Sequence, residues 1–150
     1  MGVFVDENDT FPIKIYYKEN RNEDNDLLNV EVSNKYNDGW NELNAYFCQP
    51  SVATFSAILE EATVLNSLNQ KPVIRTRTLR DLILIHFMKD WSLSDSSNNK
   101  IPINQDTIGK LVFSIANELF LQYIYSVKID VYLQAIIKDE NNNENLLRGL

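Results

Sequence analysis

The amino-acid sequence predicts an α+β fold, in which a small N-terminal antiparallel sheet is followed by three to four helices. Segments before Cys48 are rich in β-branched and aromatic residues, whereas apolar residues after Pro50 recur at spacings of three and four. The length of 150 residues fits one ordinary domain, and no internal repeat or domain boundary is visible. We therefore expect residues 1–150 to form a single domain with flexible ends at 1–10 and 139–150.

Three segments are expected to form the N-terminal sheet. Residues 11–18 and 27–34 show partial alternation of apolar and polar side chains, and the wholly polar linker ENRNEDND separates them. Asn37-Asp38-Gly39 predicts a turn before a third strand at about residues 42–48. The three strands together would make a small antiparallel sheet.

Two helices are expected to follow the sheet. The first covers about residues 52–65, with Ser51 as its N-cap and apolar residues on one face. The second covers about residues 78–90, and its middle is apolar on nearly every side. Such a pattern predicts burial between other elements of the fold.

The stretch KDWSLSDSSNNKIPIN, residues 89–104, has a polar centre between two apolar flanks. Residues 94–99 carry no apolar side chain, and the Asn98-Asn99 pair can adopt a positive φ, which asparagine tolerates better than most residues. A turn at this point would fold both flanks back against one core. The expected structural anchors are Trp91, Leu93, Ile101, Pro102 and Ile103. Asn104 would then cap a short helix at residues 105–110.

A long helix is predicted from about Ser114. Polar residues four apart form one stripe along it, made of Glu118, Gln122, Ser126, Asp130 and Gln134. The competing interpretation is a strand, because SVKIDVYL also alternates, and Lys128 lies off the polar stripe. The opposite side of the helix is apolar. If the small core leaves it open, four residues would contact a partner helix or a second copy of the chain: Phe120, Ile124, Val127 and Val131.

Two alternatives to that partner contact remain open. The first is plain core packing of the same apolar side. The second is an unpaired edge of the N-terminal sheet, which could accept a strand from a partner protein.

The sequence offers little chemistry for catalysis or metal binding. His86 is the only histidine, and its apolar surroundings predict a position in the core. Four-coordinate zinc needs several Cys or His ligands, and Cys48 is the only cysteine. The acidic pairs at residues 60–61 and 24/26 are expected to be exposed to solvent. A catalytic pair would need one carboxyl group to be partly buried. We therefore expect no enzyme activity, no cofactor and no metal site.

Two compositional features add to this prediction. The acidic segment at residues 139–145 lacks the central glycine and the closing glutamate of a calcium-binding loop. The chain has only four glycines, and none of them lies in a glycine-rich phosphate loop.

The charge of the chain argues against a nucleic-acid partner. The formal net charge is −7, and only Arg75, Arg77 and Arg80 cluster, which we interpret as a solvated helix end. The longest apolar run, residues 82–88, is interrupted by His86 and is too short to cross a membrane. We therefore expect no membrane contact and a location in a cytoplasm or in a soluble assembly.

A buried helix that leads into DWSLSDSSNNKIPINQDTIGKL, followed by SIANELFLQYI, resembles the tail assembly chaperones of tailed bacteriophages and related minor virion proteins. The shared pattern is Trp-X-Leu, a turn, an apolar-Pro-apolar run and a capped short helix. AYFCQPSVATF is also similar to the strand that precedes a Pro-Ser helix start in that family. The likeness covers about a third of the chain. The family usually has glycine in the turn, where this chain has two asparagines.

The resemblance implies a small acidic protein of the host cytoplasm that binds the tape-measure protein and assists tail-tube subunits to polymerise around it. Independently of the resemblance, the apolar helix stripe would allow the chain to associate with itself into a homo-oligomer. The first alternative is a structural virion protein, such as a connector or minor tail component that stays in the particle. A further alternative is an acidic inhibitor that occupies the nucleic-acid channel of a host defence protein.

Overall fold

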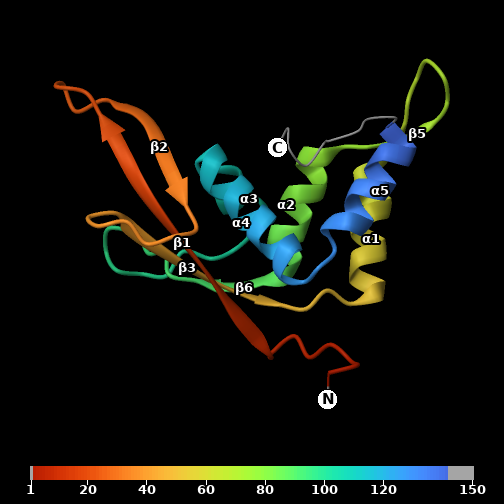
Figure 1. Ribbon diagram of the computed structural model, residues 1–150, viewed down its shortest axis with the longest axis horizontal. Helices are drawn as coiled ribbons and strands as arrows, with labels where there is room; N and C mark the ends of the chain where they lie inside the picture. Colours follow the sequence, from red (N-terminus) through yellow and green to blue (C-terminus); the bar gives the residue numbers. More distant parts are fainter. Residues whose placement is uncertain (1, 142–150) are drawn as a thin grey trace.

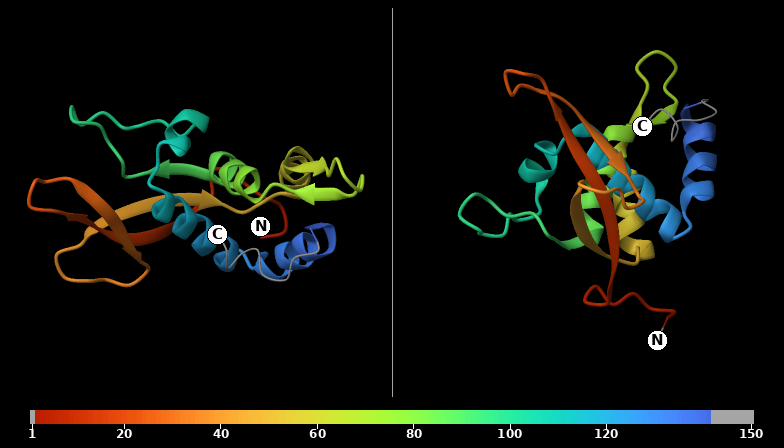
Figure 2. Two further views of the ribbon diagram at one scale, coloured as in Figure 1. Left: turned by 90° about the horizontal axis from the view of Figure 1, so that it is seen from above. Right: turned by 60° about the vertical axis from the view of Figure 1, so that its left-hand side comes forward.

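The structure of the protein is a computed structural model that describes residues 2–141, with side chains described as far as Lys138. Within this range an antiparallel four-stranded sheet packs against helices (Figure 1), which confirms the predicted α+β class. Helices α1 and α2 lie side by side in one layer, and α4 and α5 lie in a second layer (Figure 2). The expected tail at 139–150 contributes its first three residues to α5, and residues 142–150 lie outside the described range.

The sheet has the strand order β2-β1-β3-β6. The three strands expected from the sequence are β1 (Thr10–Arg21), β2 (Leu27–Ser33) and β3 (Asn41–Cys48). Strand β1 pairs with β3 through its first half and with β2 through its second half, so the β1–β2 hairpin projects beyond the helices (Figure 1). Alternate side chains of β1 and β3 face the core, namely Ile13, Ile15, Leu43, Ala45 and Phe47.

Strand β6 (Met88–Trp91) occupies residues that were predicted to end a helix, so that prediction is wrong for these positions. The helix is α2 (Thr76–Phe87), and it ends where Met88 becomes extended. Strand β6 pairs with β3, with Trp91 opposite Ala45. Interstrand hydrogen bonds to β3 replace the helical hydrogen bonds at this point. The local spacing of apolar residues does not reveal a partner strand that is distant in the sequence.

Helix α1 (Val52–Ala62) begins as predicted, because the Ser51 hydroxyl accepts a hydrogen bond from the Thr54 N–H at 3.3 Å. It ends three residues earlier than expected. Residues predicted as its last turn form β4 (Thr63–Leu65), which pairs with β5 (Pro72–Ile74) in a separate two-stranded hairpin. Both strands are only three residues long, which is too short for a visible alternation.

The turn at residues 94–100 joins its flanks as the sequence predicts. The Trp91 side chain is buried, and its indole Nε1–H donates to the Ile101 carbonyl at 2.6 Å. Asn98 has a φ of 64°, and the Ile101 N–H donates to the Leu93 carbonyl at 3.1 Å. The polar centre is thus an exposed tip between paired flanks.

The other expected anchors differ in burial. Leu93, Ile101 and Ile103 are half-buried against the core, whereas Pro102 is exposed. Pro102 contributes its carbonyl instead, which accepts a hydrogen bond from the Thr107 hydroxyl at 2.7 Å. That bond holds the start of α3 (Gln105–Gly109), where Asn104 and Thr107 form a reciprocal capping box.

The long helix predicted from Ser114 is two helices, α4 (Phe113–Ser126) and α5 (Asp130–Asn141). The chain reverses at Lys128, which has a φ of 62°. This break allows Leu133 and Ile137 to be buried while α5 packs against β5. The prediction of one continuous helix is therefore wrong, and the alternative strand is also absent from residues 126–133.

Tyr123 of α4 lies at the centre of the aromatic core. Its hydroxyl donates to the Cys48 carbonyl at 2.9 Å, and its ring lies 4.7 Å from that of Phe47 and 5.7 Å from that of Phe87, measured between centroids. Burial raises the pKa of the Tyr123 hydroxyl, and it also raises the pKa of the Cys48 thiol. These contacts join α4 to the end of β3 and to α2.

Candidate interaction surfaces

The four predicted partner-contact residues do not form one exposed stripe. Phe120 and Ile124 are fully buried in the core, and Val127 is half-buried against it. Val131 is 72% exposed. The stripe is divided because the chain reverses at Lys128, so only the part on α5 reaches the surface.

An apolar groove lies between the start of α1 and the start of α5, and we call it the α1–α5 groove. Its volume is about 280 Å³. Val52 at the first position of α1 is 86% exposed, and the rings of Phe55 and Tyr132 lie 6.1 Å apart between centroids across the groove. The lining residues are Pro50, Ser51, Val52, Phe55, Ser56, Ile129 and Tyr132. Ile129 and Tyr132 place this groove next to the predicted contact residue Val131.

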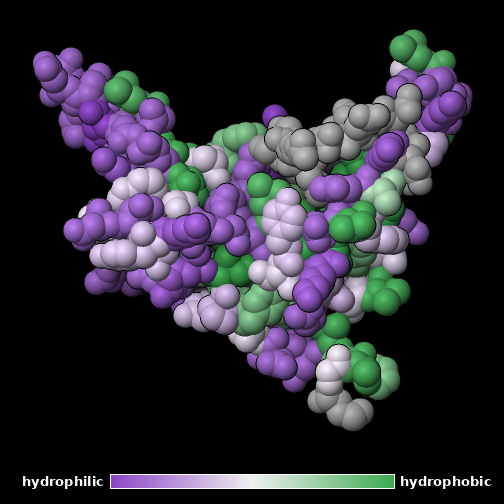
Figure 3. Space-filling model, in the orientation of Figure 1, coloured by the Kyte–Doolittle hydropathy of each residue, from purple (hydrophilic) through white to green (hydrophobic). Residues whose placement is uncertain are grey.

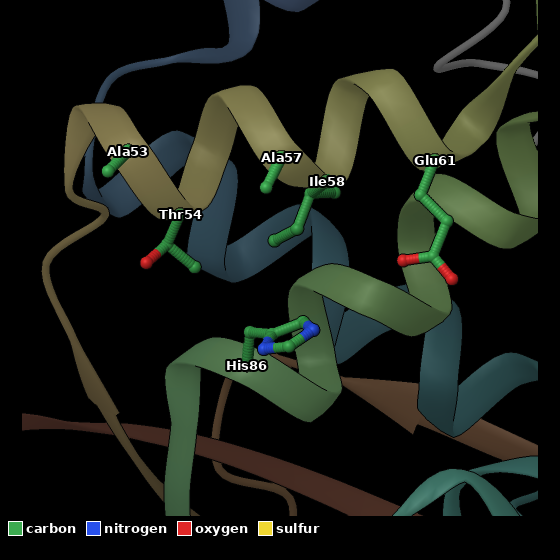
Figure 4. Close-up of a pocket in the computed structure, with 6 residues that line it drawn as sticks. All are labelled: Ala53, Thr54, Ala57, Ile58, Glu61 and His86. Carbon is green, nitrogen blue, oxygen red and sulfur yellow. The ribbon is translucent and has the colours of Figure 1, made fainter.

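A second groove, of about 390 Å³, lies between α1 and α2. His86 is exposed there rather than buried in the core, so the predicted core position is wrong. Figure 4 shows its ring beneath Ala57 and Ile58, with Glu61 farther along α1. No ion pair joins His86 to Glu61, so this groove does not hold an oriented acid–base pair.

The remaining acidic residues of the predicted pairs are exposed. Glu60 is exposed on α1, and Asp24 and Asp26 are exposed in the β1–β2 turn, where their N–H groups donate to the Asn22 side chain. In the part of the chain that the structure describes, no three His, Cys, Asp or Glu side chains lie close enough together to hold a metal ion. No helix of the described chain combines the length and apolar content that crossing a membrane requires.

The arginine cluster is divided between surface and interior. Arg75 and Arg77 are exposed, but Arg80 is only 6% exposed, so the interpretation as a solvated helix end is wrong for Arg80. Its spacing of three and four from Ile83 and Leu84 places it on the buried face of α2, and this was the available sequence signal. The aliphatic part of arginine tolerates such burial when its charged group is bonded.

The edges of the sheet are partly covered. Strand β2 pairs only with β1, but α4 packs against it, and the Ser114 hydroxyl donates to the Val30 carbonyl at 3.1 Å. The other edge is β6, which has only four residues. Neither edge is the long open strand that strand addition uses most readily.

Further exposed apolar residues are scattered over the projecting segments. Figure 3 shows them at the tip of the β4–β5 hairpin and along the N-terminal segment, where they include Leu68 and Phe4. Single exposed apolar residues are common on protein surfaces and need no partner. The α1–α5 groove differs because its apolar residues line one concave surface.

Comparison of the chain with protein-family models, with curated proteins and with solved structures gives no match.

Proposed function

We propose that the protein is an assembly factor that acts by binding another protein, in the manner of a tail assembly chaperone of a tailed bacteriophage. The α1–α5 groove is the observation that carries the proposal. It has an apolar lining, and Val52 at its rim is almost fully exposed. The sequence pattern from Trp91 through the capped helix α3 supports the particular class, with a tape-measure protein as the partner.

The groove fits an amphipathic helix better than an extended strand. Val52, Phe55 and Ser56 follow the spacing of one helix face, Tyr132 approaches from α5, and Ile129 lies just before the start of α5. A partner helix laid between α1 and α5 would insert apolar side chains at the same three- and four-residue spacing. Burial of these side chains would supply the favourable free energy of binding.

The groove is tested by a charge placed at its rim. We expect Val52→Glu to abolish co-purification of the chain with a co-expressed tape-measure protein while the melting temperature stays close to that of the wild type. The fold should tolerate this change, because Val52 is exposed and an acidic residue in the first turn of a helix is favourable.

The matched control is Leu68→Glu, because Leu68 is 94% exposed at the tip of the β4–β5 hairpin and lies outside the groove. Both variants add the same charge in place of an exposed aliphatic side chain. Retained co-purification in Val52→Glu, or equal loss in the two variants, would contradict binding in the groove.

Mass spectrometry of purified phage particles tests the role in assembly. An assembly chaperone should be present in the lysate before particles are purified and absent from the finished particles. Presence in the particles at a stoichiometric copy number would instead favour the structural virion protein and exclude a chaperone that leaves.

A further inference from the structure

A pocket of about 280 Å³ lies where α2 meets α3 and α4, and we call it the Arg80 pocket. Its wall is more polar than that of the α1–α5 groove, because it contains the charged groups of α2. The lining residues are Arg77, Arg80, Asp81, Ile108, Gly109, Leu111, Phe113 and Ala116.

The described residues satisfy only part of the buried guanidinium of Arg80. Its Nε–H donates to the Asp81 carboxylate at 2.9 Å, and its Nη1 donates to the Asn117 side-chain oxygen at 2.8 Å. Its Nη2 group has no acceptor among the described residues. A buried donor without an acceptor is costly, and arginine keeps its positive charge at any ordinary pH. The pocket therefore favours a ligand that brings an acceptor.

The charge of the wall favours an anionic acceptor. Arg77 is exposed one turn before Arg80, and none of the ion pairs among the described residues includes it. Two arginines against the single carboxylate of Asp81 leave the wall with a net positive charge, on a chain whose overall charge is −7. A carboxylate matches the planar guanidinium better than most anions.

An exposed aromatic ring completes the pocket. Phe113 is 57% exposed, and the Arg80 Cζ lies 5.2 Å from the centroid of its ring. Leu111 is half-buried beside it. These two side chains form an apolar wall next to the arginines, so the ligand should join an apolar group to its anionic group.

We propose that the Arg80 pocket binds a carboxylate attached to an apolar group. The carboxylate accepts hydrogen bonds from Arg80 Nη2 and Arg77, and the apolar group packs on Phe113 and Leu111. A small organic acid and an acidic residue beside an aromatic residue of a protein both have this chemistry. The site is separate from the α1–α5 groove, so this proposal does not depend on the proposed function.

The test is a nuclear magnetic resonance titration of the full chain, with the arginine side-chain N–H and phenylalanine ring signals observed. Phenylacetate is the main probe, and 2-phenylethanol and inorganic phosphate are its neutral and purely anionic counterparts. We expect saturable shifts at Arg80 and Phe113 with phenylacetate, at a Kd on the order of millimolar for so small a ligand. The peptide acetyl-Phe-Asp-amide forms a further arm.

Two exposed positions allow variants that spare the fold. We expect Arg77→Gln to weaken phenylacetate binding about tenfold, as loss of a charged hydrogen bond would do. Phe113→Ala should weaken phenylacetate but leave the weak response to phosphate unchanged. Lys18→Gln on β1 makes the same charge change at a distant exposed residue and should have no effect.

Binding of phenylacetate and the peptide supports a protein as the source of the carboxylate, and binding of phenylacetate alone supports a small acid. No saturable shift with phenylacetate would overturn the proposal. An equal response to 2-phenylethanol would show that the carboxylate is not recognised, and tighter binding of phosphate would show that the apolar wall is not used. Either result also overturns the proposal.

Discussion

Replacement of Trp91 by alanine is expected to lower the free energy of unfolding by roughly 3–5 kcal/mol. The indole is almost fully buried and donates to the Ile101 carbonyl, so the change leaves both a cavity and an unpaired acceptor. A loss of this size is a large part of the roughly 5–15 kcal/mol that stabilises a typical domain. Urea unfolding followed by circular dichroism measures it without dependence on tryptophan fluorescence.

Two further variants separate the causes of that loss. Trp91→Phe keeps much of the buried ring but removes the indole N–H, so it should be less destabilising than Trp91→Ala. Ser96→Ala changes the exposed tip of the same turn and should have almost no effect. If Trp91→Ala unfolded at the wild-type urea concentration, Trp91 would not be an anchor, and its side chain would be exposed in solution.

Replacement of Tyr123 by alanine should have an effect of similar size, roughly 3–5 kcal/mol. The ring packs against Phe47 and Phe87, and the hydroxyl group satisfies the carbonyl of Cys48 at the end of β3. Tyr123→Ala thus removes contacts that join helix α4 to the sheet. Thermal and urea unfolding should both show the loss.

One comparison variant changes Tyr123 itself, and the other changes a second tyrosine of α4. Tyr123→Phe keeps the ring and removes the hydroxyl, and it should cost about 1–3 kcal/mol because the Cys48 carbonyl loses its buried donor. Tyr125→Ala removes an exposed tyrosine two residues further along and should cost much less. Equal destabilisation by Tyr123→Ala and Tyr125→Ala would contradict the central position of Tyr123.

The sequence predicted local features well where neighbouring residues carry the signal. The N-cap at Ser51, the capping residue Asn104 and the positive φ at Asn98 each depend on a few adjacent residues, and each is present in the structure. The burial of Trp91 was also predictable, because apolar flanks around a polar turn have to share one core.

The predictions failed where distant residues decide the conformation. Met88 continues a helical pattern in the sequence, but it begins a strand because β3 offers an edge to pair with. His86 lies among apolar neighbours in the sequence, yet its position on α2 faces the open groove beside α1. The spacing of apolar residues in the sequence reveals neither which strand will pair with Met88 nor where a neighbouring helix leaves His86 exposed.

The candidate surfaces depend still more on the tertiary structure. The sequence alone determined an acidic α+β domain, its first three strands and the apolar character of its helices. Only the tertiary structure decided which apolar faces were buried: α4 packs Phe120 into the core, and the turn at Lys128 brings Tyr132 of α5 to Phe55. It also decided that Arg80 is buried beside Phe113. Exposure is a property of packed neighbours, and those neighbours are distant in the chain.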